Sequence, residues 1–155
     1  MSEATGRVTV RDLARTDEAA WRELWAGYLT FYEAMLPPET TDLTWERLAG
    51  DDPAFQGLVA VDGGPDGTIV GIANAILHPS SWSEAPFCLL NDLYVSPAAR
   101  GKGAGRALID ALIARGREQG WARVYWVTKE TNATARLLYD TYGPADGFIR
   151  YTVKV

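Results

Sequence analysis

The stretch from Phe87 to Gly120 constrains the fold of this chain more than any other part of the sequence. Residues 87–95 are almost continuously apolar, as in a buried strand, and Pro97 ends this strand because proline cannot donate to a sheet ladder. Three glycines follow at positions 101, 103 and 105. Apolar residues then recur at helical spacing until Gly120. A buried strand that turns directly into an amphipathic helix predicts a domain in which helices pack on a sheet.

The rest of the chain predicts a mixed α/β domain with the element order βααβββαβαβ. Strands are expected at residues 8–10, 55–61, 68–77, 87–95, 123–128 and 148–155. Helices are expected at about 16–35, 42–48, 104–119 and 135–142. The turn from Asp62 to Gly67 predicts a hairpin, and residues 79–86 are expected to form a loop. No internal repeat or linker interrupts the pattern, so we expect one domain over residues 1–155.

Composition excludes several classes of protein and site. One cysteine (Cys88) and one histidine (His78) allow no disulfide framework and argue against a zinc site, so no metal is expected. No apolar run approaches the roughly 20 residues that a membrane span needs. Residues 1–11 carry no apolar stretch typical of a signal peptide, and the net charge of −5 argues against nucleic-acid binding. We therefore expect a cytoplasmic protein.

The glycine-rich turn has the features of a pyrophosphate-binding site. The first N–H groups of a helix lack internal partners and carry the positive end of the helix dipole. Glycine allows the backbone to approach an anion, and Arg100, Lys102 and Arg106 add positive charge. A Walker A loop would need Ser or Thr where Gly103 stands, and a dinucleotide fingerprint would need a small residue in place of Arg106. Both of these nucleotide-binding motifs are therefore excluded.

The remaining pattern, Arg100-x-x-Gly103-x-Gly105, resembles the GNAT superfamily of acyl-CoA-dependent N-acetyltransferases. The flanking segments 92–95 and 106–108 are also similar to that family. The resemblance implies a twisted, mostly antiparallel sheet flanked by helices, with acetyl-CoA (coenzyme A) as the acyl donor. By position it implies these cofactor-binding residues: Leu93, Tyr94, Val95, Arg100, Gly101, Lys102, Gly103, Ala104, Gly105, Arg106, Asn132, Ala135 and Tyr139.

A second segment, 126–139, resembles the other half of the GNAT cofactor site. In the family the strand before this helix splays from the preceding strand, and the pantetheine arm lies in the gap. The match by position assigns pantetheine contacts to the backbone of Leu93 and Val95 and to Asn132. Tyr139 matches the tyrosine near the CoA sulfur. A phenol with a reference pKa of about 10 can donate a proton to a departing thiolate, although an aromatic at this helical spacing is otherwise a core residue.

The reaction also needs a general base, for which the sequence offers one candidate at this position. An amine must lose a proton before it attacks, and a carboxylate at the end of the central strand is the usual acceptor. Residues 91–92 resemble an acidic pair of polyamine-type GNAT members, but Asn91 stands in the first place and an amide cannot accept this proton. Asp92 remains, either as the base or as a structural carboxylate that orders the strand.

The acceptor site is expected to attract a cation. The aromatic stripe of the first helix resembles that of GNAT members acting on polyamines, basic peptides or amino acids, and aromatic faces attract ammonium groups. The expected substrate-binding residues are Tyr32, Trp82, Glu84, Asn91 and Asp92. We therefore predict an N-acetyltransferase that acts on a small-molecule or lysine-like primary amine. Because members of the family often form dimers, the resemblance also implies a homodimer. The alternative is a non-catalytic acyl-CoA-binding or regulatory module on the same fold.

Overall fold

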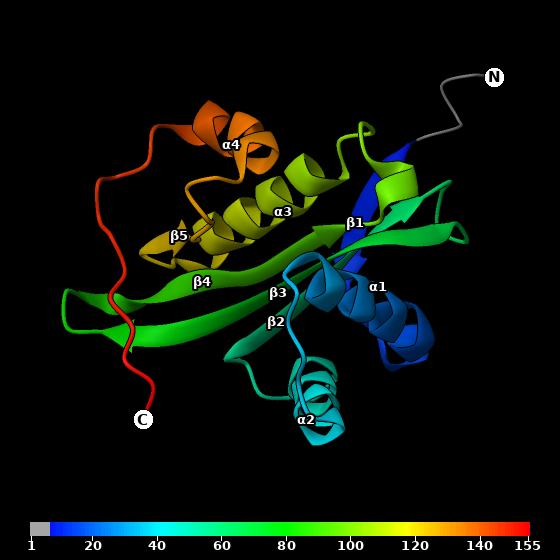
Figure 1. Ribbon diagram of the computed structural model, residues 1–155, viewed down its shortest axis with the longest axis horizontal. Helices are drawn as coiled ribbons and strands as arrows, with labels where there is room; N and C mark the ends of the chain where they lie inside the picture. The colour runs from blue at the N-terminus through cyan, green and yellow to red at the C-terminus, as the bar shows by residue number, and fades with distance from the viewer. Residues whose placement is uncertain (1–6) are drawn as a thin grey trace.

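The computed structural model describes residues 7–155, and a single sheet organises them (Figure 1). Its five strands lie side by side in sequence order. They are β1 (Val8–Asp12), β2 (Phe55–Asp62), β3 (Thr68–Ser80), β4 (Ser83–Val95) and β5 (Arg123–Tyr125). Neighbours from β1 to β4 are antiparallel, and β5 is parallel to β4. The predicted mixed, mostly antiparallel sheet is confirmed. Residues 1–6, on which part of the signal-peptide expectation rests, lie outside the described residues.

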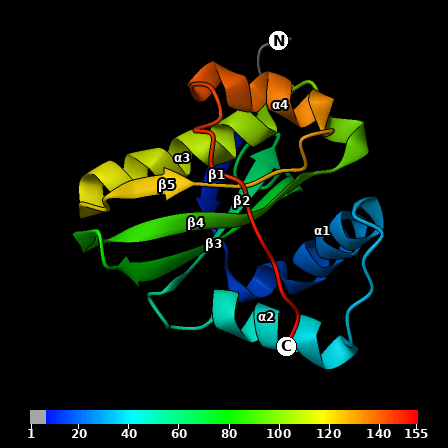
Figure 2. The ribbon, with the colours of Figure 1, turned by 60° about the vertical axis from the view of Figure 1, so that its left-hand side comes forward.

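Helices cover both faces of this sheet, as Figure 2 shows. They are α1 (Glu18–Phe31), α2 (Pro38–Ala49), α3 (Ala104–Gln119) and α4 (Ala133–Tyr139). On one face α3 buries Leu108, Ile109 and Leu112 against an aliphatic core. On the other face α1 and α2 bury a core rich in tryptophan, with Trp21, Trp25 and Trp45 at its centre. Among residues 7–155, no helix combines the length and apolarity needed to cross a membrane.

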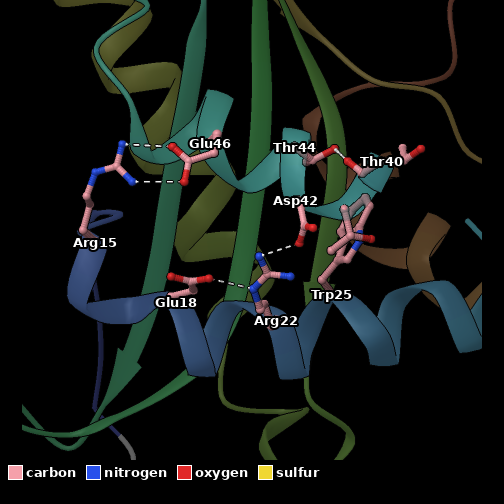
Figure 3. A network of polar contacts seen from close by, with 9 residues as sticks. Arg15, Glu18, Arg22, Trp25, Thr40, Asp42, Thr44 and Glu46 are labelled. Carbon is pink, nitrogen blue, oxygen red and sulfur yellow. Dashed lines mark hydrogen bonds and ion pairs between the residues drawn. The ribbon is translucent and has the colours of Figure 1, made fainter. Parts of the chain in front are cut away.

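Polar contacts between α1 and α2 hold the tryptophan-rich side together (Figure 3). Arg22 bonds Glu18 within α1 and Asp42 of α2, each at 2.9 Å. The Trp25 indole Nε1 donates to Thr41 Oγ1 at 3.1 Å, so a buried indole keeps a hydrogen-bond partner. Because exposed ion pairs add little stability, these contacts link α1 and α2 while the buried tryptophan core contributes most to their packing.

Three expectations about strands and loops were wrong. Residues 148–155 alternate but form no strand, and every residue from Gly143 to Val155 is exposed. Alternating apolar and polar residues indicate a segment with one apolar face, but they do not identify the strand edge with which it pairs. Residues 79–86 are not a loop, because β3 and β4 continue into a tight hairpin whose tip lies between Ser80 and Ser83. The fifth strand ends at Tyr125 rather than Thr128, because β4 and β5 separate there.

Candidate active site

A β-bulge in the middle of β4 forms the centre of the site. Asn74 of β3 pairs with Asp92, whereas the next residue, Ala75, pairs with Leu90. Asn91 is therefore the extra residue of β4, without a partner opposite it. A bulge bends the strand and re-aims the side chains beside it. At the bulge the side chains of Asn91 and Asp92 no longer point to opposite faces, and the Asn91 amide reaches the Asp92 carboxylate.

A network of hydrogen bonds surrounds Asp92. The amide nitrogens of Asn74 and Asn91 each donate to Asp92 Oδ2 at 3.2 Å. The Asn74 amide is itself oriented by Trp21, whose Nε1 donates to Asn74 Oδ1 at 3.2 Å. Accepting from Trp21 fixes which end of the Asn74 side chain faces the carboxylate. The chain Trp21–Asn74–Asp92 thus joins α1, β3 and β4 at one buried point.

Burial raises the pKa of Asp92. Only 8% of the residue is exposed, and an ionised carboxylate in such a place loses hydration. The hydrogen bonds of Asn91, Tyr28 and Asn74 oppose the rise in pKa without cancelling it. The pKa of Tyr28 is also raised, first by burial and then by the nearby Asp92 charge. A carboxylate with a raised pKa is a better proton acceptor than an exposed aspartate, because it binds a proton more readily.

The gap between β4 and β5 contains the predicted tyrosine. The two strands pair only where residues 87–89 meet residues 123–125, so from Leu90 onward the edge of β4 is not bonded to β5. A small cavity of about 20 Å³ lies in this gap. It is lined by Tyr28, Tyr32, Leu90, Asn91, Leu93, Trp126, Val127 and Tyr139. Burial, followed by the nearby Tyr32, raises the pKa of Tyr139 to about 12, so its phenol stays protonated and able to donate.

A larger cavity of about 460 Å³ lies on the α1–α2 side of the sheet. Three residues, Tyr28, Tyr32 and Asn91, line both this cavity and the small one. Asp92 lines the larger cavity, and the rest of its wall is mainly apolar. Arg47 of α2 adds a cation to this wall, with its guanidinium 5.4 Å from the centre of the Phe55 ring. Asp92 and Tyr139 therefore line two neighbouring cavities that have three wall residues in common.

The turn between β4 and α3 has the backbone of an anion cradle. Gly101 and Gly103 adopt φ values of +87° and +81°, in the region that favours glycine. A Cβ added at either position would meet no atom within 4 Å, so open space adjoins this backbone. Gly103 is the N-cap of α3, whose first N–H groups have no partner within the helix. The turn thus combines room, free donors and the positive end of a helix, which fits a diphosphate.

Three cations surround this turn. Arg100 Nε donates to the Val95 carbonyl at 3.3 Å, and Arg106 donates to Thr141 Oγ1 at 2.9 Å. Lys102 Nζ lies 2.9 Å from Asp62 Oδ2. The predicted residues Ala104 and Gly105 begin α3, where a Cβ on Gly105 would stand 3.3 Å from Leu138 of α4. The positive charges of these three side chains complement an anionic group such as a diphosphate.

The structure brings most of the predicted residues to one region. Asn132 is the N-cap of α4, with its amide 3.1 Å from Thr128 Oγ1, and Ala135 lies one turn before Tyr139. Trp82 and Glu84 do not join this region. Both lie at the tip of the β3–β4 hairpin, and neither lines either cavity. Glu84 precedes Asn91 by seven residues along one strand, a separation of roughly 20 Å.

Other site residues were not singled out from the sequence. Asn74 and Arg47 line the larger cavity, Asn74 also contacts Asp92, and neither residue had been proposed. Asn74 had a detectable signal, because it is one polar residue inside the apolar run of β3 and such a residue needs a buried partner. Arg47 had no signal, since an arginine on an amphipathic helix is usually a solvated surface residue.

Comparisons with known proteins agree with this geometry. Residues 19–143 match the family model described as the acetyltransferase (GNAT) family. The chain is 38% identical over 133 residues to a D-amino-acid N-acetyltransferase of Saccharomyces cerevisiae, covering 86% of this chain and 82% of that protein. A ribosomal-protein-alanine N-acetyltransferase from Brucella melitensis superposes with a TM-score of 0.78 at 25% identity, covering 96% and 100% of the two chains. AAC(6')-Iy, solved with the bisubstrate analogue CoA-S-monomethyl-acetylneamine, shares the fold, with a TM-score of 0.77, 19% identity and coverage of 96% and 99%.

Proposed function

Because the chain belongs to the acetyltransferase (GNAT) family and transfers an acetyl group from acetyl-CoA to an amine, we propose that three of its regions divide this reaction among them. The turn from Arg100 to Arg106 binds the diphosphate of the donor. Asp92 receives the proton of the acceptor amine. Tyr139 donates a proton to the sulfur that leaves. The alternative of a non-catalytic acyl-CoA-binding module is not favoured, because the relatives are named N-acetyltransferases.

The observation that carries this proposal is that Asp92 and Tyr139 line two neighbouring cavities whose walls share Tyr28, Tyr32 and Asn91. Acetyl-CoA supplies an activated thioester, and the protein has to deliver a neutral amine to it. The amine enters through the larger cavity, where Asp92 takes its proton directly or through water. The edge of β4 near Leu93 to Val95 is not paired with β5. Its backbone N–H groups stabilise the negative charge that develops on the thioester carbonyl oxygen. Tyr139 then protonates the sulfur from the other side of the gap.

For the acceptor we propose an amino acid, recognised by its amine and its carboxylate. The named activity of the 38%-identical yeast relative supports this class. The larger cavity supports it too, because Asp92 and Arg47 provide one acid and one cation on largely apolar walls. In the described part of the chain Arg47 forms no ion pair, so its charge is available to a carboxylate. Tyr32 and Asn91 line both cavities, and the Tyr32 ring centre lies 5.7 Å from Lys129 Nζ.

A panel of acceptors tests the proposal. Thiol release from acetyl-CoA is measured with D- and L-amino acids, with the corresponding decarboxylated amines, and with polyamines. We expect amino acids to be the better acceptors, and Arg47→Met to raise their KM about tenfold while leaving the decarboxylated amines unchanged. Arg15→Met, at an exposed arginine paired with Glu46, is the matched control. A preference for amines that lack a carboxylate would contradict this acceptor class and leave the acetyltransfer itself intact.

The proposal extends to the organisation of the protein. Residues 1–155 form one acetyltransferase domain, since the family match spans most of the chain without a break. Cys88 is buried and unpaired, which suits a reducing compartment, so we place the enzyme in the cytoplasm. Because members of the family often form dimers, we also propose that the protein is a homodimer.

A further inference from the structure

The larger cavity on the α1–α2 side has more room than the reacting amine needs. Its volume is about 460 Å³, which is within the range of pockets that enclose a whole small molecule. Within residues 7–155, its wall holds two charged side chains, those of Asp92 and Arg47. The proposed function uses Asp92 for the amine of the acceptor and Arg47 for its carboxylate. The rest of the wall is therefore left to the side chain of the acceptor.

Most of this remaining wall is aliphatic or aromatic. Its main apolar members are Trp25, Leu29, Leu36, Leu48, Phe55 and Ile76. They come from both helices, from the connection between them, and from strands β2 and β3. A wall of this kind complements an apolar ligand, because apolar surface that leaves water on binding stabilises the complex.

The neutral polar side chains of the wall offer few partners to a polar substituent. Thr44 Oγ1 already donates to the Thr40 carbonyl at 3.0 Å, and the Asn74 side chain belongs to the hydrogen-bond network of the buried carboxylate. Tyr32 and Asn91 also line the small cavity, so they lie at the end where the acetyl group is transferred. A polar side chain on the acceptor would lose water at the apolar wall without gaining hydrogen bonds in return, which weakens binding.

Leu36 reaches this wall from the connection between α1 and α2 (Figure 1). The connection begins with a helix cap in which Ala34 N donates to the Leu29 carbonyl at 2.9 Å and Glu33 adopts a left-handed φ of +53°. Pro37 follows Leu36 directly and restricts its backbone. Leu36 is 41% exposed, so it lies at the rim of the cavity, on a backbone that is held on both sides.

We propose that this wall selects amino acids with a large apolar side chain, such as leucine, methionine or phenylalanine, and that Leu36 helps to set the preference. The inference rests on the proposed function, because it takes the amine and the carboxylate to be bound by Asp92 and Arg47. One methylene in a hydrophobic pocket changes kcat/KM by roughly 10- to 200-fold, so alanine is expected to be a poor acceptor. A polar side chain of the same shape as leucine is expected to be rejected as well, because its polar atoms would stay unpaired.

Acceptor pairs of similar shape and different polarity test the preference on the wild-type enzyme. Thiol release from acetyl-CoA is measured with leucine against asparagine and with phenylalanine against histidine, each as the enantiomer that is the better acceptor. We expect kcat/KM to be at least about tenfold higher for the apolar member of each pair. A difference below about threefold in either pair would overturn the inference and leave amino acids as the acceptor class. If only amines without a carboxylate are acetylated, both the acceptor class and this inference are wrong.

Leu36→Asp tests the part that Leu36 plays in the preference. A carboxylate at the rim disfavours apolar side chains and attracts a cationic one, so kcat/KM for arginine relative to leucine is expected to rise at least about tenfold. Because both acceptors are measured on one sample, a loss of folded enzyme does not change this ratio. Leu43→Asp is the matched control, since Leu43 is 49% exposed on α2 and lines neither cavity. An unchanged ratio in Leu36→Asp, or an equal rise in the control, would overturn the role of Leu36.

Discussion

Two aspartates are buried in the described part of the chain, and their surroundings shift the carboxyl pKa in opposite directions. Asp17 lies between β1 and α1, where both terminal nitrogens of Arg11 bond its carboxylate at 2.7 and 2.9 Å. The hydrogen bonds from Arg11 lower the pKa of Asp17, against the effect of burial. Asp92 lies at the β4 bulge among amides and a phenol, and burial raises its pKa.

This difference in pKa distinguishes a carboxylate that stabilises the fold from one that can take part in proton transfer. A buried carboxylate paired with a guanidinium is stable as an anion and gains nothing by taking a proton. A buried carboxylate that has only neutral partners gains stability when it is protonated, so it can accept a proton from a substrate. Both residues are about equally buried, so the charge of the neighbours decides the behaviour of each carboxylate.

The largest expected effect comes from removing each carboxylate in turn. We expect Asp92→Asn to lower kcat for thiol release by roughly 10³-fold, because the amide cannot take the proton. Asp17→Asn should leave the kcat of the folded enzyme within about threefold of the wild type, since Asp17 lines neither cavity. Steady-state kinetics with saturating acetyl-CoA measures both. An Asp92→Asn enzyme that keeps more than a tenth of normal turnover would remove Asp92 as the base.

Two tyrosines extend the comparison to the proton donor. Tyr139 and Tyr142 both pack on Trp126, with ring centroids 5.6 and 5.7 Å away, and burial is the main cause that raises the pKa of each to about 12. Only Tyr139 lines the gap between β4 and β5, whereas the Tyr142 hydroxyl lies 2.7 Å from an Asp110 oxygen. We expect Tyr139→Phe to lower kcat about 10²-fold and Tyr142→Phe to lower it less than threefold. Equal losses in the two variants would point to packing instead of proton donation.

Two glycines test the cradle in the same way. Gly103 and Gly64 both adopt positive φ, at +81° and +88°, and a Cβ on either meets no atom within 4 Å. Alanine therefore strains both backbones similarly, by about 1–2 kcal/mol. Gly103→Ala should also raise the Kd for acetyl-CoA about tenfold, because its Cβ enters the space proposed for the diphosphate. Gly64→Ala, in the β2–β3 turn, should leave the Kd unchanged. Calorimetric titration of both variants decides between these outcomes.

The smallest expected effect is on stability, and its sign depends on pH. The ion pair of Asp17 stabilises the fold above the unfolded pKa of about 3.9, and this stability is lost as pH falls through the lower folded pKa. Asp92 behaves in reverse, because its protonated form stabilises the fold at low pH and this is lost as pH rises through the raised folded pKa. Denaturant unfolding near pH 7 should find Asp17→Asn less stable by about 1 kcal/mol, since Arg11 is partly exposed. Asp92→Asn should be no less stable than the wild type, and a clear loss in that variant would contradict the assignment of its pKa.

The sequence predicted those parts of the molecule whose information is local. The strand, turn and helix from Phe87 to Gly120 lie together in the chain, so spacing alone locates the cradle and the helix that begins at Ala104. The separation of β4 from β5 was also expected, although only through the family resemblance. Residues 148–155 show the limit, because alternation identifies a segment that can pair but not the edge that pairs with it.

The acceptor side depended on tertiary contacts that the sequence does not show. Burial raises the pKa of Asp92, and the hydrogen bond from Asn74 on β3 opposes this rise only in part. Segment 91–95 contains no sign of either effect. The register of the β3–β4 hairpin decides that Asn91 falls at the bulge while Trp82 and Glu84 fall at the tip. A shift of a few residues in that register would have placed other side chains at the cavity. Aromatic and acidic residues therefore predicted the kind of site but not all of its members.

The most direct test of the difference between the two aspartates is their titration. NMR spectra of protein labelled at the aspartate carboxyl carbon are recorded against pH, and the signals of Asp17 and Asp92 are assigned by their loss in the two Asn variants. Burial among neutral partners predicts that Asp92 titrates above about 3.9, whereas the guanidinium of Arg11 predicts that Asp17 titrates below it. If Asp92 titrates at or below the pH of Asp17, it is a compensated structural acid and the proposed base is wrong.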